Sequence, residues 1–389
     1  MIKQCKLLLL GIVIPFLLVT SCRKPTAPPD HDTGILWTKT YGGAYDDWGY
    51  SVEQTSDEGY IIVGYTNSFN AGDYEVYLIK TDKNGDTLWT KTYRGVEGSF
   101  GYSVQQSSDG GYIIAGQNII IISAASDVYI IKTDENGDTM WTRNYGQALY
   151  YEAGLSIQET FDGGYIIAGS TYLVSPPDPG DVYLIKTDIN GDTLWTRVYE
   201  CGDYGTCVQQ ANDGGYIITG VSSMSYQTNK MDVLLIKTDE NGDTLWAKTY
   251  GGEKSEAGKS VQQTSDGGYI VLGTISFDRC SYLIKTNANG DTLWTRIYDE
   301  GMGYSVLQTS DGGYIIAGYT TSYGTGDADI FILKTDSDGN ILWTSTCGGE
   351  NYDAGRSIIE TSDGAYIIVG TTGSFGSGGH DVYLVKFRQ

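Results

Sequence analysis

Histidine and basic residues are scarce in this sequence, and their scarcity narrows the chemistry it can support. The chain has two histidines, His31 and His380, too few for a histidine-built metal centre or a convincing Ser-His-Asp set. Lysine and arginine number 25 against 48 acidic residues, which gives a formal charge of −23. This excess of negative charge argues against nucleic acid and anionic lipid as partners. Glycoside hydrolysis needs only two carboxylates, so an enzyme of that kind stays open.

Long apolar runs, helical periodicity and cysteine are also rare. Beyond residue 22 no apolar run is long enough to span a membrane, and no segment keeps a 3.6-residue period. We therefore expect little helix. Cys201 and Cys207 flank a short connection and can form a disulfide in an oxidising compartment. Free buried thiols are the alternative for these two, and the disulfide state of Cys280 and Cys347 stays open.

The N-terminus reads as an export signal. Lys3 and Lys6 precede an apolar run over 7–19, which is short for a permanent membrane span. The run ends in Val-Thr-Ser-Cys, with the cysteine at position 22, and this phrase resembles the lipobox of bacterial lipoproteins. The resemblance implies a signal peptide over 1–21 and acylation of Cys22. Residues 22–34 are polar and rich in proline, as expected of a flexible tether. The protein is then predicted to be lipid-anchored in the cell envelope outside the cytoplasm, with inner or outer membrane undecided.

Three phrases recur seven times each, in the same order, along the rest of the chain. The Trp of Leu-Trp-Thr and related phrases stands at positions 37, 89, 141, 195, 246, 294 and 343. The Asp that opens Asp-Gly-Gly-Tyr-Ile-Ile stands at 57, 109, 162, 213, 266, 311 and 363. The Lys that closes Val-Tyr-Leu-Ile-Lys stands at 80, 132, 186, 237, 285, 334 and 386. A repeat of roughly 50 residues indicates a repeat architecture.

Each unit predicts four short strands joined by tight turns. In the unit over 101–145, the expected strands are Tyr102–Ser107, Tyr112–Gly116, Val128–Thr133 and Thr139–Tyr145. Asp-Gly-Gly and Asn-Gly pairs supply the hairpin turns. The second and third strands are almost wholly apolar, which is typical of a sheet covered on both faces.

The chain ends predict a closed ring. The last unit stops after its third strand, at Tyr383–Phe387, and the first begins with an isolated fourth strand, Ile35–Tyr41. The N-terminal strand can therefore complete the last sheet and remove two open edges. We predict an all-β, seven-bladed β-propeller over 35–389, built from four-stranded blades.

Two resemblances support this fold. The unit near 347–386 resembles the SBBP-type propeller repeat of secreted bacterial proteins, and the phrase over 238–246 is similar to the tryptophan-docking motif of quinoprotein-like propellers. The second resemblance implies that each Trp packs between neighbouring blades. It does not extend to a quinoprotein dehydrogenase, because that family usually has eight blades and adjacent cysteines. Both resemblances indicate fold and are poor guides to activity.

The repeat also separates two faces. The hairpin turns that hardly vary should share one face, and the connections that differ in every unit should share the other, where a ligand would bind at the channel mouth. That face is rich in aromatic and acidic residues, which suit sugars or a protein partner. Trp48 is the strongest single candidate because it is the only Trp outside the repeated phrase. The candidate ligand-binding residues are Tyr45, Asp46, Asp47, Trp48, Phe100, Tyr150, Tyr151, Glu152, Tyr204, Tyr323, Tyr352 and Asp353.

Two other repeated features have structural explanations. The Asp-x-Asn-Gly-Asp turns partly resemble the start of a calcium loop but lack its later ligands, so calcium carries low weight and no cofactor is expected. The seven repeated lysines are expected to pair with the neighbouring acidic turn or to cover apolar side chains.

The function that fits best is a monomeric, membrane-tethered, non-enzymatic binding module. A carbohydrate binder or glycoside hydrolase-like surface protein is the first alternative, and an envelope assembly scaffold is the second. Whether the protein is an enzyme is left undecided, with the balance against catalysis.

Overall fold

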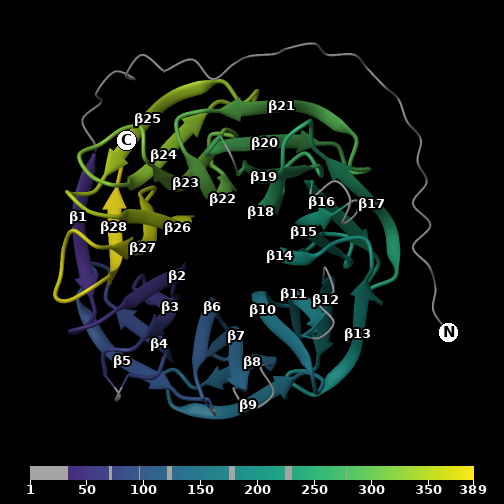
Figure 1. The fold of residues 1–389 in the computed structure, drawn as a ribbon, viewed down its shortest axis with the longest axis horizontal. Helices are drawn as coiled ribbons and strands as arrows, with labels where there is room; N and C mark the ends of the chain where they lie inside the picture. Colours follow the sequence, from purple (N-terminus) through teal and green to yellow (C-terminus); the bar gives the residue numbers. More distant parts are fainter. Residues whose placement is uncertain are drawn as a thin grey trace.

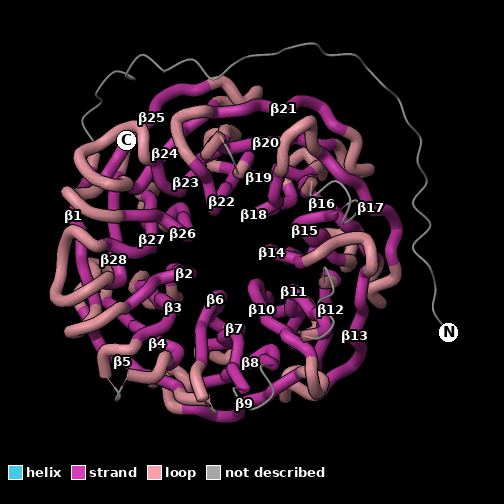
Figure 2. The backbone as a smooth tube through the Cα atoms, viewed as in Figure 1, coloured by secondary structure: helices cyan, strands magenta, loops and turns pink. Residues whose placement is uncertain are grey.

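The computed structural model describes residues 34–69, 72–95, 97–120, 125–174, 180–223, 230–276 and 278–389. Within these ranges the protein is all-β, with 28 strands and no helix, which confirms the predicted class (Figure 2). The expected signal peptide, Cys22 and the tether up to residue 33 lie outside the described residues.

The strands form four-stranded antiparallel sheets that radiate from an open centre (Figure 1). The innermost strands are β2 (Asp47–Gln54), β6 (Ser99–Gln106), β10 (Tyr150–Glu159), β14 (Tyr204–Gln210), β18 (Glu256–Gln263), β22 (Met302–Gln308) and β26 (Asp353–Glu360). The second strands are β3 (Tyr60–Thr66), β7 (Tyr112–Ile120), β11 (Tyr165–Leu173), β15 (Tyr216–Ser223), β19 (Tyr269–Ile275), β23 (Tyr314–Thr320) and β27 (Tyr366–Thr372).

The outer half of each sheet follows the same order. The third strands are β4 (Glu75–Thr81), β8 (Ala125–Thr133), β12 (Asp181–Thr187), β16 (Met231–Thr238), β20 (Cys280–Thr286), β24 (Asp329–Thr335) and β28 (Asp381–Phe387). The outermost strands are β5 (Thr87–Tyr93), β9 (Thr139–Tyr145), β13 (Thr193–Tyr199), β17 (Thr244–Tyr250), β21 (Thr292–Tyr298), β25 (Ile341–Cys347) and β1 (Ile35–Tyr41). A single bridge between Tyr151 and Ser126 joins the sheets of β6–β9 and β10–β13.

The N-terminal strand pairs with the C-terminal one. β1 runs antiparallel to β28, and the order of that sheet is β1-β28-β27-β26. This confirms the expectation that the isolated first strand completes the last unit. The strand bounds differ in the second unit, where β7 and β8 continue pairing as far as Ile120 and Ala125. The expected loop there is shorter because the ladder extends into it.

The hydrophobic core lies between neighbouring sheets. One cluster joins Tyr60 and Ile62 of β3 to Ile367 and Val369 of β27, and equivalent clusters fill the other junctions. The second and third strands are buried on both faces, which is why they are apolar at nearly every position.

The outer strands lock each sheet to the next. Trp37 of β1 packs against Tyr60 at 6.2 Å between ring centroids, and the Tyr41 hydroxyl donates to the Gly85 carbonyl at 2.6 Å. Gly85 has a φ of +77°, and a Cβ there would lie 2.8 Å from the Trp37 ring. The turn residue must therefore be glycine, both for its backbone conformation and for the indole. The implied placement of Trp between neighbouring sheets is confirmed.

A second set of contacts joins the sheets near the centre. The side-chain oxygen of a Gln or Glu late in each inner strand accepts a backbone N–H from a turn of the preceding sheet. Among the described residues these pairs are Ser56–Gln106, Ser108–Glu159, Phe161–Gln210, Asn212–Gln263, Ser265–Gln308, Ser310–Glu360 and Ser362–Gln54. The last pair, at 2.8 Å, links the C-terminal sheet to the first.

The repeated lysines pair with the aspartates of the turns between the first and second strands, which is one of the two roles expected of them. Lys132 is almost completely buried, and its Nζ lies 2.8 Å from the Asp109 carboxylate. The same ion pair forms at the other six units.

Candidate functional site

The mouth of the ring on the variable side carries the candidate site. We call the side with the connections between second and third strands, and between outer and next inner strands, the variable face. Trp48 lies at the start of β2 beside this face, and its ring contacts Tyr65, Tyr352 and His380. Sequence reasoning singled out Trp48 because it breaks the repeat, and the structure gives it a place among other rings.

These rings form a continuous series that we call the aromatic arc. Successive members lie 4.8–6.5 Å apart between ring centroids. In order along the series they are Tyr304, Tyr319, Tyr352, Trp48, Tyr65, Phe100 and Tyr102, with Tyr50 contacting both Tyr65 and Tyr102. The arc crosses four neighbouring sheets, so it depends on their assembly.

Part of the arc comes from a repeated β-bulge on the inner strands. Each inner strand shifts register by one residue after a glycine, as between Gly49 and Ser51. An extra residue in a bulge is unpaired and its side chain is re-aimed. The bulged residues are Tyr50, Tyr102, Leu155, Thr206, Lys259, Tyr304 and Arg356. All are half-buried, and we call this set the channel belt.

Two cations occupy the channel belt. The Arg356 guanidinium lies 4.4 Å from the Tyr304 ring centroid and 5.6 Å from that of Tyr50. Burial and the nearby Arg356 charge lower the pKa of Lys259, so the two cations are close enough to repel each other. Sequence reasoning missed both, although the position between Gly and Ser varies more than its neighbours in the repeat.

The remaining predicted aromatic residues lie outside the arc. Tyr151 stacks on Tyr172 at 4.9 Å, and Tyr45 is exposed beside a hollow of about 600 Å³ lined also by Asn67, Ser68 and Phe69. Tyr150 and Tyr204 are half-buried, and burial raises the pKa of Tyr204. The Tyr323 hydroxyl is buried near Glu300.

Three of the predicted acids are buried within the loops. Asp47, Glu152 and Asp353 are 0–1% exposed, and each accepts a backbone N–H of the connection before its strand. These carboxylates hold the connections in place, and their burial speaks against direct contact with a ligand. Asp46 is more accessible, and its carboxylate lies 3.0 Å from Nδ1 of His380, whose ring centroid is 4.8 Å from that of Trp48.

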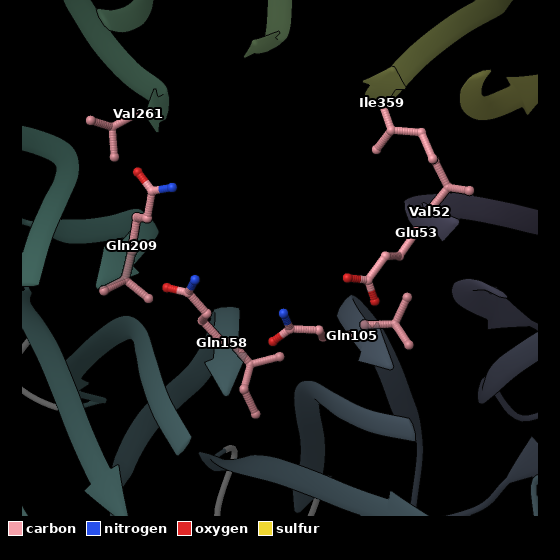
Figure 3. Close-up of a pocket in the computed structure, with 10 residues that line it drawn as sticks. Val52, Glu53, Gln105, Gln158, Gln209, Val261 and Ile359 are labelled. Carbon is pink, nitrogen blue, oxygen red and sulfur yellow. The ribbon is translucent and has the colours of Figure 1, made fainter. Parts of the chain in front are cut away.

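The other end of the channel has a different lining. A cavity of about 270 Å³ is bounded by residues of six inner strands, including Glu53, Gln105, Gln158 and Gln209 (Figure 3). The Gln105 side-chain oxygen accepts the N–H of Glu159 at 2.6 Å, and Gln158 and Gln209 make equivalent bonds to the next strand. Glu53 replaces glutamine at its junction and accepts the N–H of Gln106. Burial raises the pKa of Glu53 to about 7.

No disulfide joins the four cysteines of the described ranges, so the expected Cys201–Cys207 pairing is not seen there. The two side chains pack at different junctions between neighbouring sheets. Cys201 packs into the core cluster shared with β11 and β12, whereas Cys207 packs into the cluster shared with β19.

Neither a metal centre nor a membrane helix is found in the part of the chain that the structure describes. No three His, Cys, Asp or Glu side chains gather there in a way that could hold a metal ion. In the Asp-x-Asn-Gly-Asp turns, the first carboxylate accepts turn N–H groups, as Asp82 does from Asn84 and Asp86 at 2.8 Å. Within the same ranges, no helix long and apolar enough to cross a membrane occurs.

Comparisons with known proteins support the fold. No family model matches the sequence, and no curated protein matches it. Among solved structures, the chain is similar to a protein of unknown function from Dyadobacter fermentans, with 11% identity, 91% and 99% of the two chains covered and a TM-score of 0.52. It is also similar to the Neurospora crassa Pan2 WD40 domain, with 10% identity, 93% and 91% coverage and a TM-score of 0.53.

A third similar structure is a puromycin hydrolase, with 12% identity, a TM-score of 0.54 and coverage of 85% of this chain and 53% of that one. At such low identity these likenesses concern the fold alone. They agree with a propeller-like, all-β repeat protein.

Proposed function

We propose that residues 35–389 form a closed, seven-bladed β-propeller that binds a ligand at its variable face without catalysis. Closure is supported by the pairing of β1 with β28 and by the hydrogen bond from Ser362 to Gln54, which joins the last and first sheets. The similarity to the Pan2 WD40 domain supports the same architecture.

The aromatic arc is the observation that carries the binding role. Rings from four sheets meet at one mouth, with Trp48 half-buried among them. A partly exposed aromatic platform on a rigid ring suits a sugar ring or a protein anchor residue, because it offers apolar area at low entropic cost.

Binding is favoured over glycoside hydrolysis by the state of the acids. A hydrolase needs two carboxylates that face the substrate. Of the four predicted acids, Asp47, Glu152 and Asp353 are buried and engaged with loop N–H groups, which leaves Asp46 as the accessible carboxylate among them.

A glycan array combined with a hydrolysis assay tests this proposal. The protein should bind at least one glycan without turnover, and Trp48→Ala should weaken binding at least about tenfold, as for an interface anchor. Phe161→Ala is the matched control, because Phe161 is 73% exposed on a hairpin turn of the opposite face. Equal loss in both variants, or turnover of a bound glycan, would contradict the proposal.

We also propose that Cys22 anchors the propeller in the cell envelope. The support is the lipobox-like phrase and the apolar run before it. Cells fed an alkyne fatty acid should label the wild-type protein, and Cys22→Ser should abolish the label and release the protein from membranes. Retention of Cys22→Ser in the membrane fraction would refute the anchor.

A further inference from the structure

The channel belt holds two positive charges in a protein with a formal charge of −23. Arg356 belongs to β26 and Lys259 to β18, with Tyr304 of β22 on the sheet between them. Both cations occupy the bulge position of an innermost strand, so the same β-bulge places each of them.

Neither cation has a carboxylate partner among the described residues, where seventeen other ion pairs are found. Arg356 lies over the faces of Tyr304 and Tyr50 and hydrogen-bonds the Tyr304 side chain, but its Nε is buried with no hydrogen-bond acceptor. A buried guanidinium donor without an acceptor costs free energy that an anionic ligand would recover.

Repulsion between the two cations supports the same conclusion. Burial and Arg356 both lower the pKa of Lys259, so holding these charges together is unfavourable in the free protein. A carboxylate beside Tyr304 would relieve the repulsion and accept a hydrogen bond from the Arg356 Nε. Aromatic rings of the arc lie beside this point, as Tyr352 and Tyr304 both contact Tyr319.

We infer that Arg356 and Lys259 form an acceptor site for the carboxylate of an acidic sugar, whose ring packs on the neighbouring aromatic arc. This inference rests on the proposed binding role of the variable face and names its ligand class. Neutral sugars can use the rings but leave the two cations unpaired, so acidic sugars should bind more tightly.

Titration calorimetry with oligogalacturonate, its methyl ester and a neutral xylo-oligosaccharide tests the inference. We expect the acid oligomer to bind at least about tenfold more tightly than the ester, and less tightly as salt increases. Arg356→Gln and Lys259→Gln should each weaken acid binding about tenfold or more. Arg356→Lys should retain much of the binding because it keeps the charge.

Arg94→Gln is the control, since Arg94 is half-exposed and already paired with Asp73. Unchanged melting temperatures would show that the variants fold. The inference would be overturned if the acid, ester and neutral oligomers bound equally well. If Trp48→Ala then weakened this binding and Lys259→Gln did not, the binding role would remain intact. Failure of the wild-type protein to bind the acid oligomer would also overturn the inference, while the glycan array separately decides the binding role.

Discussion

Glu53 offers a sharp test of the hydrogen bonds between sheets that are made by side chains lining the cavity of Figure 3. Glutamine oxygens of the equivalent position accept a backbone N–H at 2.6 Å in the following four junctions. Glu53 accepts the equivalent N–H with a carboxyl oxygen. Burial raises the pKa of this carboxyl group from 4.5 to about 7. The folded state binds the Glu53 proton more tightly than the unfolded state does. The stability that this protonation contributes is therefore fully present below pH 4.5. It is lost as the pH rises through 7.

The difference between the folded and unfolded pKa values of Glu53 sets the size of the change in stability. Its upper limit is about 3 kcal/mol, at 1.36 kcal/mol for each unit of pKa difference. Partial solvent access reduces this limit, so we expect about 1–2 kcal/mol.

Glu53→Gln should therefore match the wild-type protein in urea denaturation at pH 5 and exceed its stability by that amount at pH 8.5. The reciprocal variant Gln105→Glu should introduce the same pH dependence at the next junction. A Glu53→Gln difference that is equal at both pH values, or a wild-type protein more stable at pH 8.5, would refute the reasoning.

Three further outcomes follow from the contacts of single residues. Burial raises the pKa of Asp381 to about 6. In calorimetry, Asp381→Asn should therefore melt at a higher temperature than wild type at pH 8 and at the same temperature near pH 4. A difference in melting temperature that does not change with pH would contradict this. The pKa of Asp311 is lowered to about 2 despite partial burial, because Thr309 and Lys334 stabilise the carboxylate, so this contribution is present above pH 3.8 and lost as pH falls through 2. Asp311→Asn should lower the melting temperature at pH 7, and no loss there would count against the ion pair. Gly85→Ala should destabilise more than Gly110→Ala in urea titrations, by about 1–3 kcal/mol, because both have positive φ but only Gly85 faces Trp37; equal losses would mean that the indole does not matter.

Most of the fold could be predicted because its determinants are local and repeated. Three phrases that recur seven times in the same order predicted four strands in each unit. The last unit lacks its fourth strand and the chain begins with an isolated one, which predicted the pairing of β1 with β28. The repeated lysines were expected to pair with a neighbouring acidic turn or to cover apolar side chains, but the sequence did not identify which acid; Lys132 pairs across the sheet with Asp109, 23 residues earlier in the chain.

The site was less predictable because bulges and loop packing are not visible in a two-residue alternation. Arg356 and Lys259 were overlooked, since their contacts depend on a bulge and on neighbouring sheets. Asp47 looked like a solvent-facing loop acid, but its loop turns back and its carboxylate accepts the Gly43 N–H at 2.7 Å. Trp48 stood out because repeat packing did not account for it.

Hydrogen–deuterium exchange with and without a bound glycan tests the central claim most directly, namely that the assembled ring presents its ligand site at the variable mouth. We expect added protection in peptides from β2, β6, β22 and β26, which carry Trp48, Phe100, Tyr304 and Arg356 respectively. Protection confined to the hairpin turns near Phe161 and Asp213, or to the outer strands, would contradict it.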